Sequence, residues 1–173
     1  MKKIYILVSV LMAGFFNVFA IAEEQATQRM DVLLLQKTIS KMADEDGKVE
    51  IKNNAMSFEY EGTPIFCVWD VNADRMRLVS PIAEAKDIPA EYIILALQAN
   101  YHSVLDPRYA IGDGIMYSAF IHPLSPLSVG ELESAIKQVM VANKTFGTEF
   151  SSGALVFPGA RKKTEKESDK IIM

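Results

Sequence analysis

The two histidines of the chain, His102 and His122, flank a segment that also contains Asp106. Imidazole and carboxylate groups bind zinc and act as general acids or bases, so these residues could form a metal site. Ser125 follows His122 closely and completes the residue types of a serine hydrolase. One hypothesis is therefore a small metal-dependent or hydrolytic enzyme that uses His102, Asp106 and His122.

The spacing of these residues argues against both kinds of enzyme. A zinc site needs at least three suitably spaced ligands, and the chain has neither a His-x-x-x-His nor a Cys-x-x-Cys motif. Asp113 is expected at the tip of a hairpin, away from both histidines. No Gly-x-Ser-x-Gly motif surrounds a serine, and the Gly-Asp-Gly of residues 112–114 fits a turn better than a phosphate loop. We therefore expect a non-catalytic protein with no metal and no cofactor.

Cys67 is the only cysteine of the chain, so no internal disulfide can form. It lies in the apolar run FCVW of residues 66–69, which favours a buried thiol over a nucleophile. Packing of the core must therefore provide the stability of the fold.

The first 22 residues have the pattern of a secretory signal peptide. Lys2 and Lys3 precede a long uncharged run that ends in Ala20-Ile21-Ala22, the small-residue pattern that a signal peptidase cleaves. A membrane anchor is the alternative, because about 19 apolar residues can span a bilayer. We expect cleavage after about Ala22, and hence a periplasmic or secreted protein without a stable membrane anchor.

The charge balance bears on the class of partner. The chain has 18 basic and 22 acidic residues, a net charge of −4, and loss of the two signal-peptide lysines takes this to about −6. An acidic protein is not attracted to nucleic acids or to anionic membranes. We therefore expect a protein partner and no nucleic-acid partner.

One-faced apolar patterns predict a helix at each end of the domain. The first is expected over residues 26–42, and the last from Ser128 to about Lys144. Ser128 and Glu131 fit a capping box, with Leu127 and Leu132 as the hydrophobic staple around it. The expected core stripes are Val32, Leu35, Ile39 and Met42 in the first helix, and Leu132, Ala135, Ile136 and Val139 in the last.

A middle helix is predicted between Asp87 and His102. Asp87 is expected to cap it, and Pro107 prevents its continuation. Asp106 and Arg108, on either side of Pro107, are expected to form an ion pair that fixes the bend. The predicted inward stripe of this helix consists of Ile93, Ala96, Leu97 and Tyr101.

Short alternating segments between the first two helices predict antiparallel strands with one face toward a core. The register that matches the apolar sides across the Glu61-Gly62 turn pairs Tyr60 with Thr63, Phe58 with Ile65 and Met56 with Cys67. In residues 75–81, Met76 and Leu78 are expected to face the core, and Arg75 and Arg77 to face water.

A second hairpin is predicted over residues 108–123, because Asp113-Gly114 favours a tight turn. Its predicted register pairs Ile111 with Met116 and Tyr109 with Ser118. The returning strand is apolar on both faces, so we expect one face to pack on a helix and the other to contact a protein partner or a second copy of the chain. The predicted interface residues are Ile115, Tyr117, Ala119, Phe120 and Ile121.

These elements predict an α+β fold: an antiparallel sheet of about five strands with three helices, in the order α-β-β-β(-β)-α-β-β-α. A single domain is expected over residues 23–147, followed by a docking segment or short strand over 148–160. Residues 161–173 are rich in charge and are expected to form a disordered tail.

This order of elements resembles the α/β fold of type III secretion chaperones and YbjN-like proteins, over roughly residues 26–146. The matching pieces are ALQANYHS (96–103), the hairpin after it, and PLSPLSVGELESAI (123–136), which opens a helix with a polar cap. The resemblance implies a protein-binding fold without shared catalytic residues. Those chaperones act in the cytoplasm, so the export signal is a departure, and their handling of secreted effectors is not implied. We expect an exported, non-catalytic protein-binding, chaperone-like or regulatory protein that forms a homodimer.

Overall fold

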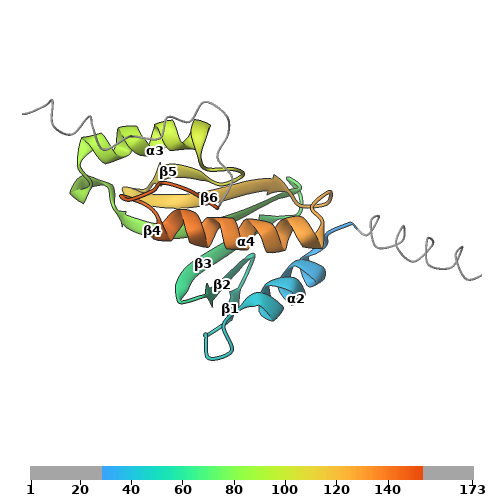
Figure 1. Ribbon diagram of the computed structural model, residues 1–173. Coiled ribbons are helices and arrows are strands. Elements are labelled where there is room, and N and C mark those ends of the chain that lie inside the picture. The colour runs from blue at the N-terminus through green and yellow to red at the C-terminus, as the bar shows by residue number, and fades with distance from the viewer. Residues whose placement is uncertain (1–28, 154–173) are drawn as a thin grey trace, which may run out of the picture.

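The computed structural model describes residues 29–153, so the predictions for the signal peptide at 1–22 and for the tail at 161–173 lie outside it. The described residues form three α-helices and a six-stranded antiparallel sheet, which confirms the predicted α+β class. Figure 1 shows how these elements are arranged. The elements are α2 (Val32–Met42), β1 (Glu50–Lys52), β2 (Ala55–Tyr60), β3 (Thr63–Asp70), β4 (Arg75–Glu84), the 3₁₀ helix η1 (Ala85–Asp87), α3 (Ala90–His102), β5 (Arg108–Gly112), β6 (Ile115–Pro123) and α4 (Val129–Lys144). No helix in this range is long and apolar enough to cross a bilayer.

The strands lie in the order β1-β2-β3-β4-β6-β5. Both predicted hairpin registers are confirmed: Phe58 pairs with Ile65 in the first, and Tyr109 with Ser118 in the second. The second turn has φ of 49° at Asp113 and 79° at Gly114, the left-handed conformation that a two-residue hairpin turn requires. Each turn fixes the register of its strand pair, so the apolar side chains of the two strands lie on the same face of the sheet.

The main core lies between the sheet and the helices α2 and α4, which cover one face (Figure 1). Leu35 and Ile39 of α2 meet Ile136 and Val139 of α4 above Leu78 in the centre of the sheet. All five side chains are fully buried. Burial of each such side chain contributes about 1.5–3 kcal/mol, so this cluster supplies much of the stability.

A second cluster lies at the far end of the sheet, where α3 runs beside β5 and the C-terminal end of α4. Ala96 and Ala99 of α3 pack on Tyr109 and Met116 of the second hairpin. The Tyr109 hydroxyl donates a hydrogen bond of 2.8 Å to the carbonyl of Ala142. This bond ties β5 to α4 in a place where an unpaired hydroxyl would be costly.

A polar seam between the two clusters holds α4 on the sheet. Asn143 donates from Nδ2 to Ser80 Oγ and to the Pro81 carbonyl, both at 2.8 Å. Ser80 Oγ in turn donates to the Pro64 carbonyl at 2.7 Å. Each of these groups has its partner, so the seam fixes the position of α4 without leaving an unpaired polar atom.

The predicted start or cap is confirmed for one helix, α4, and differs from the structure for the other two. The Ser128–Glu131 capping box of α4 is present as predicted. The first helix begins at Val32 rather than at residue 26, because the Asp31 carboxylate accepts from Leu34 N–H at 2.8 Å and caps it there. The prediction that Asp87 caps α3 is wrong, since Asp87 ends η1 and Pro89 stands at the cap position.

The predicted inward stripe of α3 is also wrong in part. Ala96 is buried as expected, but Leu97 and Tyr101 are 63% and 80% exposed. The helix is apolar on several sides, so its pattern did not define the packed face. The small side chains of Ala96 and Ala99 face the sheet instead, where they allow the helix to approach closely.

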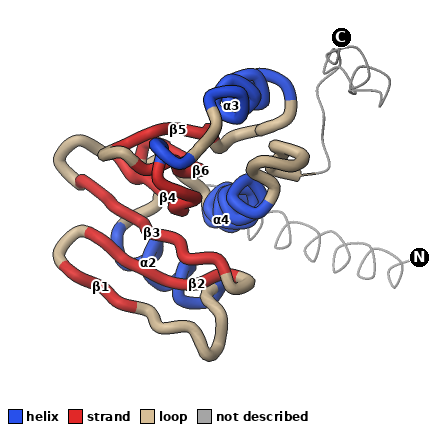
Figure 2. The backbone as a smooth tube through the Cα atoms, turned by 90° about the vertical axis from the view of Figure 1, so that its left-hand side faces the viewer, coloured by secondary structure: helices blue, strands red, loops and turns tan. Residues whose placement is uncertain are grey.

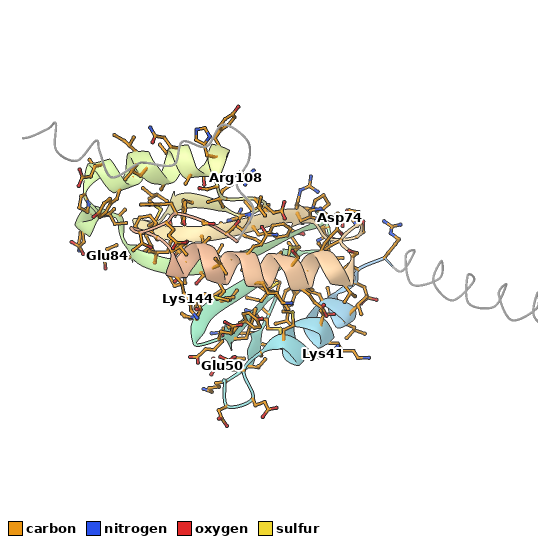
Figure 3. The ribbon with its side chains drawn as sticks, viewed as in Figure 1. Lys41, Glu50, Asp74, Glu84, Arg108 and Lys144 are labelled. Carbon is orange, nitrogen blue, oxygen red and sulfur yellow. The ribbon has the colours of Figure 1, made fainter. Side chains whose placement is uncertain are left out.

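The predicted ion pair between Asp106 and Arg108 is wrong. Arg108 Nη1 donates to the carbonyls of Val104, Leu105 and Pro107. Figure 3 labels this arginine near the end of α3. Asp106 pairs with the amide of Gln138 on α4, at 2.7 Å from Nε2. The free carbonyls after the helix end attract the guanidinium more directly than the carboxylate beyond the proline does.

The docking segment predicted over residues 148–160 is described as far as residue 153. Residues 148–153 form turns and bends and no strand. Ser103 Oγ donates to the Phe150 carbonyl at 2.5 Å, and Ser152 Oγ accepts from Leu105 N–H at 2.8 Å. This part of the segment therefore docks against the end of α3, and residues 154–160 lie outside the described range.

We predict that Asn143→Ala lowers the free energy of unfolding by about 1–3 kcal/mol, because the half-buried Pro81 carbonyl and Ser80 hydroxyl lose their donor. Chemical denaturation followed by circular dichroism measures this. Lys137→Ala, at an exposed position of the same helix, is the control and should change stability by less than about 0.5 kcal/mol. Equal effects of the two substitutions would contradict the role given to the seam.

Candidate functional site

The face of the sheet opposite the main core carries no helix among the described residues, and we call it the open face (Figure 2). Strand alternation places every second side chain there. Its central residues are Pro64, Phe66 and Val68 of β3, Arg75, Arg77, Val79 and Pro81 of β4, and Ile115, Tyr117, Ala119 and Ile121 of β6.

The pairing of the strands brings these residues into two rows. One row runs Phe66, Val79, Ala119, and the next runs Val68, Arg77, Ile121. Phe66 and Val68 are each 41% exposed and Ile121 is 58% exposed. Isolated exposed apolar residues are common, whereas neighbouring ones on a flat surface mark an interaction site.

The predicted interface residues of β6 divide between the two faces. Ile115, Tyr117, Ala119 and Ile121 lie on the open face, but Ala119, between Val79 and Arg108 of the neighbouring strands, is only 8% exposed. Phe120 lies on the opposite face, 7% exposed within the main core, because it alternates with them along the strand. The open face therefore contains four of the five predicted residues.

Phe66 and Val68 belong to this surface and were not predicted as part of it. A signal for them exists in the sequence, since the run FCVW is apolar at consecutive positions. Cys67 and Trp69 fill the core side, which leaves Phe66 and Val68 for the other side. As in β6, a strand that is apolar on both faces indicates that one face packs in the core and the other contacts a partner.

Both edges of the sheet are protected against pairing with another strand. β1 is three residues long, and its Glu50 forms an ion pair with Lys48. At the other edge, the Asn100 amide imitates a neighbouring strand: it donates from Nδ2 to the Tyr109 carbonyl at 3.1 Å and accepts from Tyr109 N–H at 2.7 Å. Short, charged or covered edges discourage strand addition.

The histidines and Asp106 are used in local packing. The His102 ring lies edge-on to Tyr101 at the end of α3. The His122 ring stacks on Phe120 at the end of β6, with Nδ1 2.8 Å from the Pro123 carbonyl. The described residues contain no group of three His, Cys, Asp or Glu side chains that could hold a metal ion.

Two other polar groups with shifted pKa values also have structural roles. The backbone N–H and hydroxyl of Ser125 donate to the Asp74 carboxylate at 2.7 and 2.8 Å, which lowers the pKa of Asp74. Burial raises the pKa of the Cys67 thiol to about 12. A thiol of this kind is a poor nucleophile near neutral pH.

A second exposed apolar surface lies on α3, and we call it the outer stripe. It consists of Ile94, Leu97 and Tyr101, spaced three and four residues apart, so they share one side of the helix. None of the three carries a charge. Leu97 and Tyr101 were predicted in the core, so only the tertiary structure reveals the outer stripe.

Neither a protein-family model nor a curated protein matches the chain. Among solved structures, it is similar to a chain in the structure of the HopA1-SchA chaperone-effector complex. The two are 15% identical, the alignment covers 64% of this chain and 94% of that chain, and the TM-score is 0.47. A similarity of this degree assigns neither a function nor a partner to this chain.

We predict that Cys67 does not react with a thiol reagent such as dithionitrobenzoate in the native protein at pH 8. With a pKa of about 12, only about one thiol in ten thousand is ionised at that pH. In guanidinium chloride the same reagent should modify one thiol per chain within minutes. Rapid native modification would show an accessible, reactive cysteine and would contradict the burial described here.

Proposed function

We propose that this protein is an exported, non-catalytic protein that binds apolar segments of other proteins, in a chaperone-like or regulatory role. The open face carries this proposal, because Phe66 and Val68 of β3 and Ile121 of β6 lie on one surface, two strands apart, and stay exposed to water. A partner that covers them gains the free energy of removing apolar surface from water.

The same structure favours binding on the face of the sheet over binding at its edge. Asn100 occupies the outward N–H and carbonyl of Tyr109, and β1 offers only three residues. A partner strand would find few unpaired backbone groups at either edge. Side chains of the open face therefore provide the contact.

The proposed export rests on the sequence, and the proposed lack of catalysis rests also on the contacts of the candidate site residues. Lys2, Lys3 and the Ala20-Ile21-Ala22 pattern support cleavage after about Ala22 and a periplasmic or secreted location. The order of elements, which resembles that of type III secretion chaperones, supports a binding role. His102, Asp106 and His122 each make local packing contacts or hydrogen bonds. These contacts support a structural role for the three residues over a catalytic one.

The proposal is tested by photo-crosslinking in the cells that make the protein. A photoreactive amino acid at Val68 or Ile121 should give adducts with envelope or secreted proteins, because both side chains lie on the open face. The same amino acid at Leu33, which is exposed on α2 away from this face, should give none.

A paired substitution gives a quantitative form of this test. Val68→Ser with Ile121→Ser should weaken capture of the crosslinked proteins at least about tenfold, since each lost apolar contact is worth about 1.5 kcal/mol. Leu33→Ser should leave capture unchanged. Adducts that form equally at Leu33, or form at neither open-face position, would show that the open face is not the binding surface.

We further propose that the chain forms a homodimer through the outer stripe rather than through the open face. Ile94, Leu97 and Tyr101 are uncharged, so a two-fold contact centred on them places no like charges opposite each other at its centre. The open face carries Arg77 in its centre, and a two-fold contact there would oppose cations. The outer stripe is therefore the better surface for a second copy.

We predict that light scattering coupled to size exclusion gives twice the mass of one chain for the protein and the mass of one chain for Leu97→Glu. A buried carboxylate without a partner strongly disfavours the contact. Leu33→Glu, at another exposed apolar position, should remain dimeric. A monomeric unmodified protein would exclude the homodimer.

A further inference from the structure

We propose that the partner segment carries a carboxylate among its apolar side chains, and that Arg77 on the open face binds it. This inference rests on the proposed function and adds the chemistry of the partner. It follows from the surroundings of Arg77, which combine an exposed guanidinium with a border of apolar side chains.

Arg77 lies in the middle of the sheet, on β4, with Val68 and Ile121 opposite it on the two neighbouring strands. Strands are spaced about 4.8 Å apart, so these two apolar residues lie about 10 Å from each other with the arginine between them. Val79 follows two positions along β4, and Phe66 and Ala119 stand beside Val79 on either side. Five apolar residues thus surround Arg77 on three sides.

Among the described residues, no carboxylate forms an ion pair with Arg77, and no side-chain hydrogen bond involves its guanidinium. The nearby charged side chains make other contacts. Asp70 lies opposite Arg75 on the open face, and its Oδ1 accepts from the backbone N–H groups of Asn72 and Ala73, at 2.9 and 3.0 Å. Arg75 donates to the Asp74 carbonyl, and Arg108 donates to carbonyls after α3.

A partner that covers Val68 and Ile121 also covers Arg77, because it lies between them. Removing a guanidinium from water without a counter-charge costs several kcal/mol and would cancel the gain from the apolar contacts. A carboxylate on the partner removes this cost, since the planar guanidinium can donate two parallel hydrogen bonds to it. A wholly apolar or a cationic segment is therefore disfavoured.

The arrangement also resembles the energetic centre of many protein interfaces. Arginine is enriched among the residues that dominate binding, and such residues are surrounded by contacts that exclude water. Here the surrounding contacts are Phe66, Val68, Val79, Ala119 and Ile121. An ion pair formed inside this border is shielded from solvent and salt more than one at a protein rim.

The test is selection from a displayed library of random peptides, with the protein immobilised and the Val68→Ser/Ile121→Ser variant used to remove unrelated binders. Peptides enriched by the protein should contain Asp or Glu flanked by apolar residues. Arg77→Glu should instead enrich Lys or Arg at the same position. Arg75→Gln is the matched control, because Arg75 lies on the same strand and face at its end, and it should keep the acidic preference.

Affinities of one enriched peptide and its Glu→Gln analogue complete the test by fluorescence anisotropy. The protein should bind the acidic peptide about tenfold more tightly than the analogue, and Arg77→Gln should bind both equally. Apolar peptides enriched without an acidic residue would overturn this inference and leave the proposed function intact. A library that yields no peptide dependent on Val68 and Ile121 would overturn both.

Discussion

The position of α4 on the sheet is the constraint on which the rest of the structure depends. Its capping box fixes where the helix begins, its apolar stripe packs on the centre of the sheet, and Asn143 holds it to Ser80 and Pro81. The helix contributes to both hydrophobic clusters, through Ile136 and Val139 in one and Ala142 in the other. Loss of this contact would expose parts of both clusters to water.

The open face follows from this one-sided packing. With α2 and α4 on the same side of the sheet, the apolar residues that β3 and β6 carry on their other side have no cover within the described residues. A sheet that served only as a scaffold would carry polar residues there. The retained Phe66, Val68 and Ile121 therefore indicate a surface that is covered in a complex, with Arg77 setting the charge of what covers it.

The two exposed surfaces differ in charge, so each is proposed to bind a different partner. The outer stripe of α3 is uncharged and suits a second copy of the chain, whereas the open face has a cation in its centre and suits an acidic segment of another protein. The edges are poor contact sites, because Asn100 covers one and the other is short.

The sequence by itself determined the features that depend on neighbouring residues: the two hairpin registers, the cap of α4 and the burial of Cys67. Turn conformation and alternation decide these locally. Only the tertiary structure decided which side of α3 faces the sheet and that Phe120 is buried while Phe66 is exposed. It also decided that Arg108 binds carbonyls rather than Asp106. These features depend on where distant segments pack, and an apolar pattern with more than one possible face does not specify that.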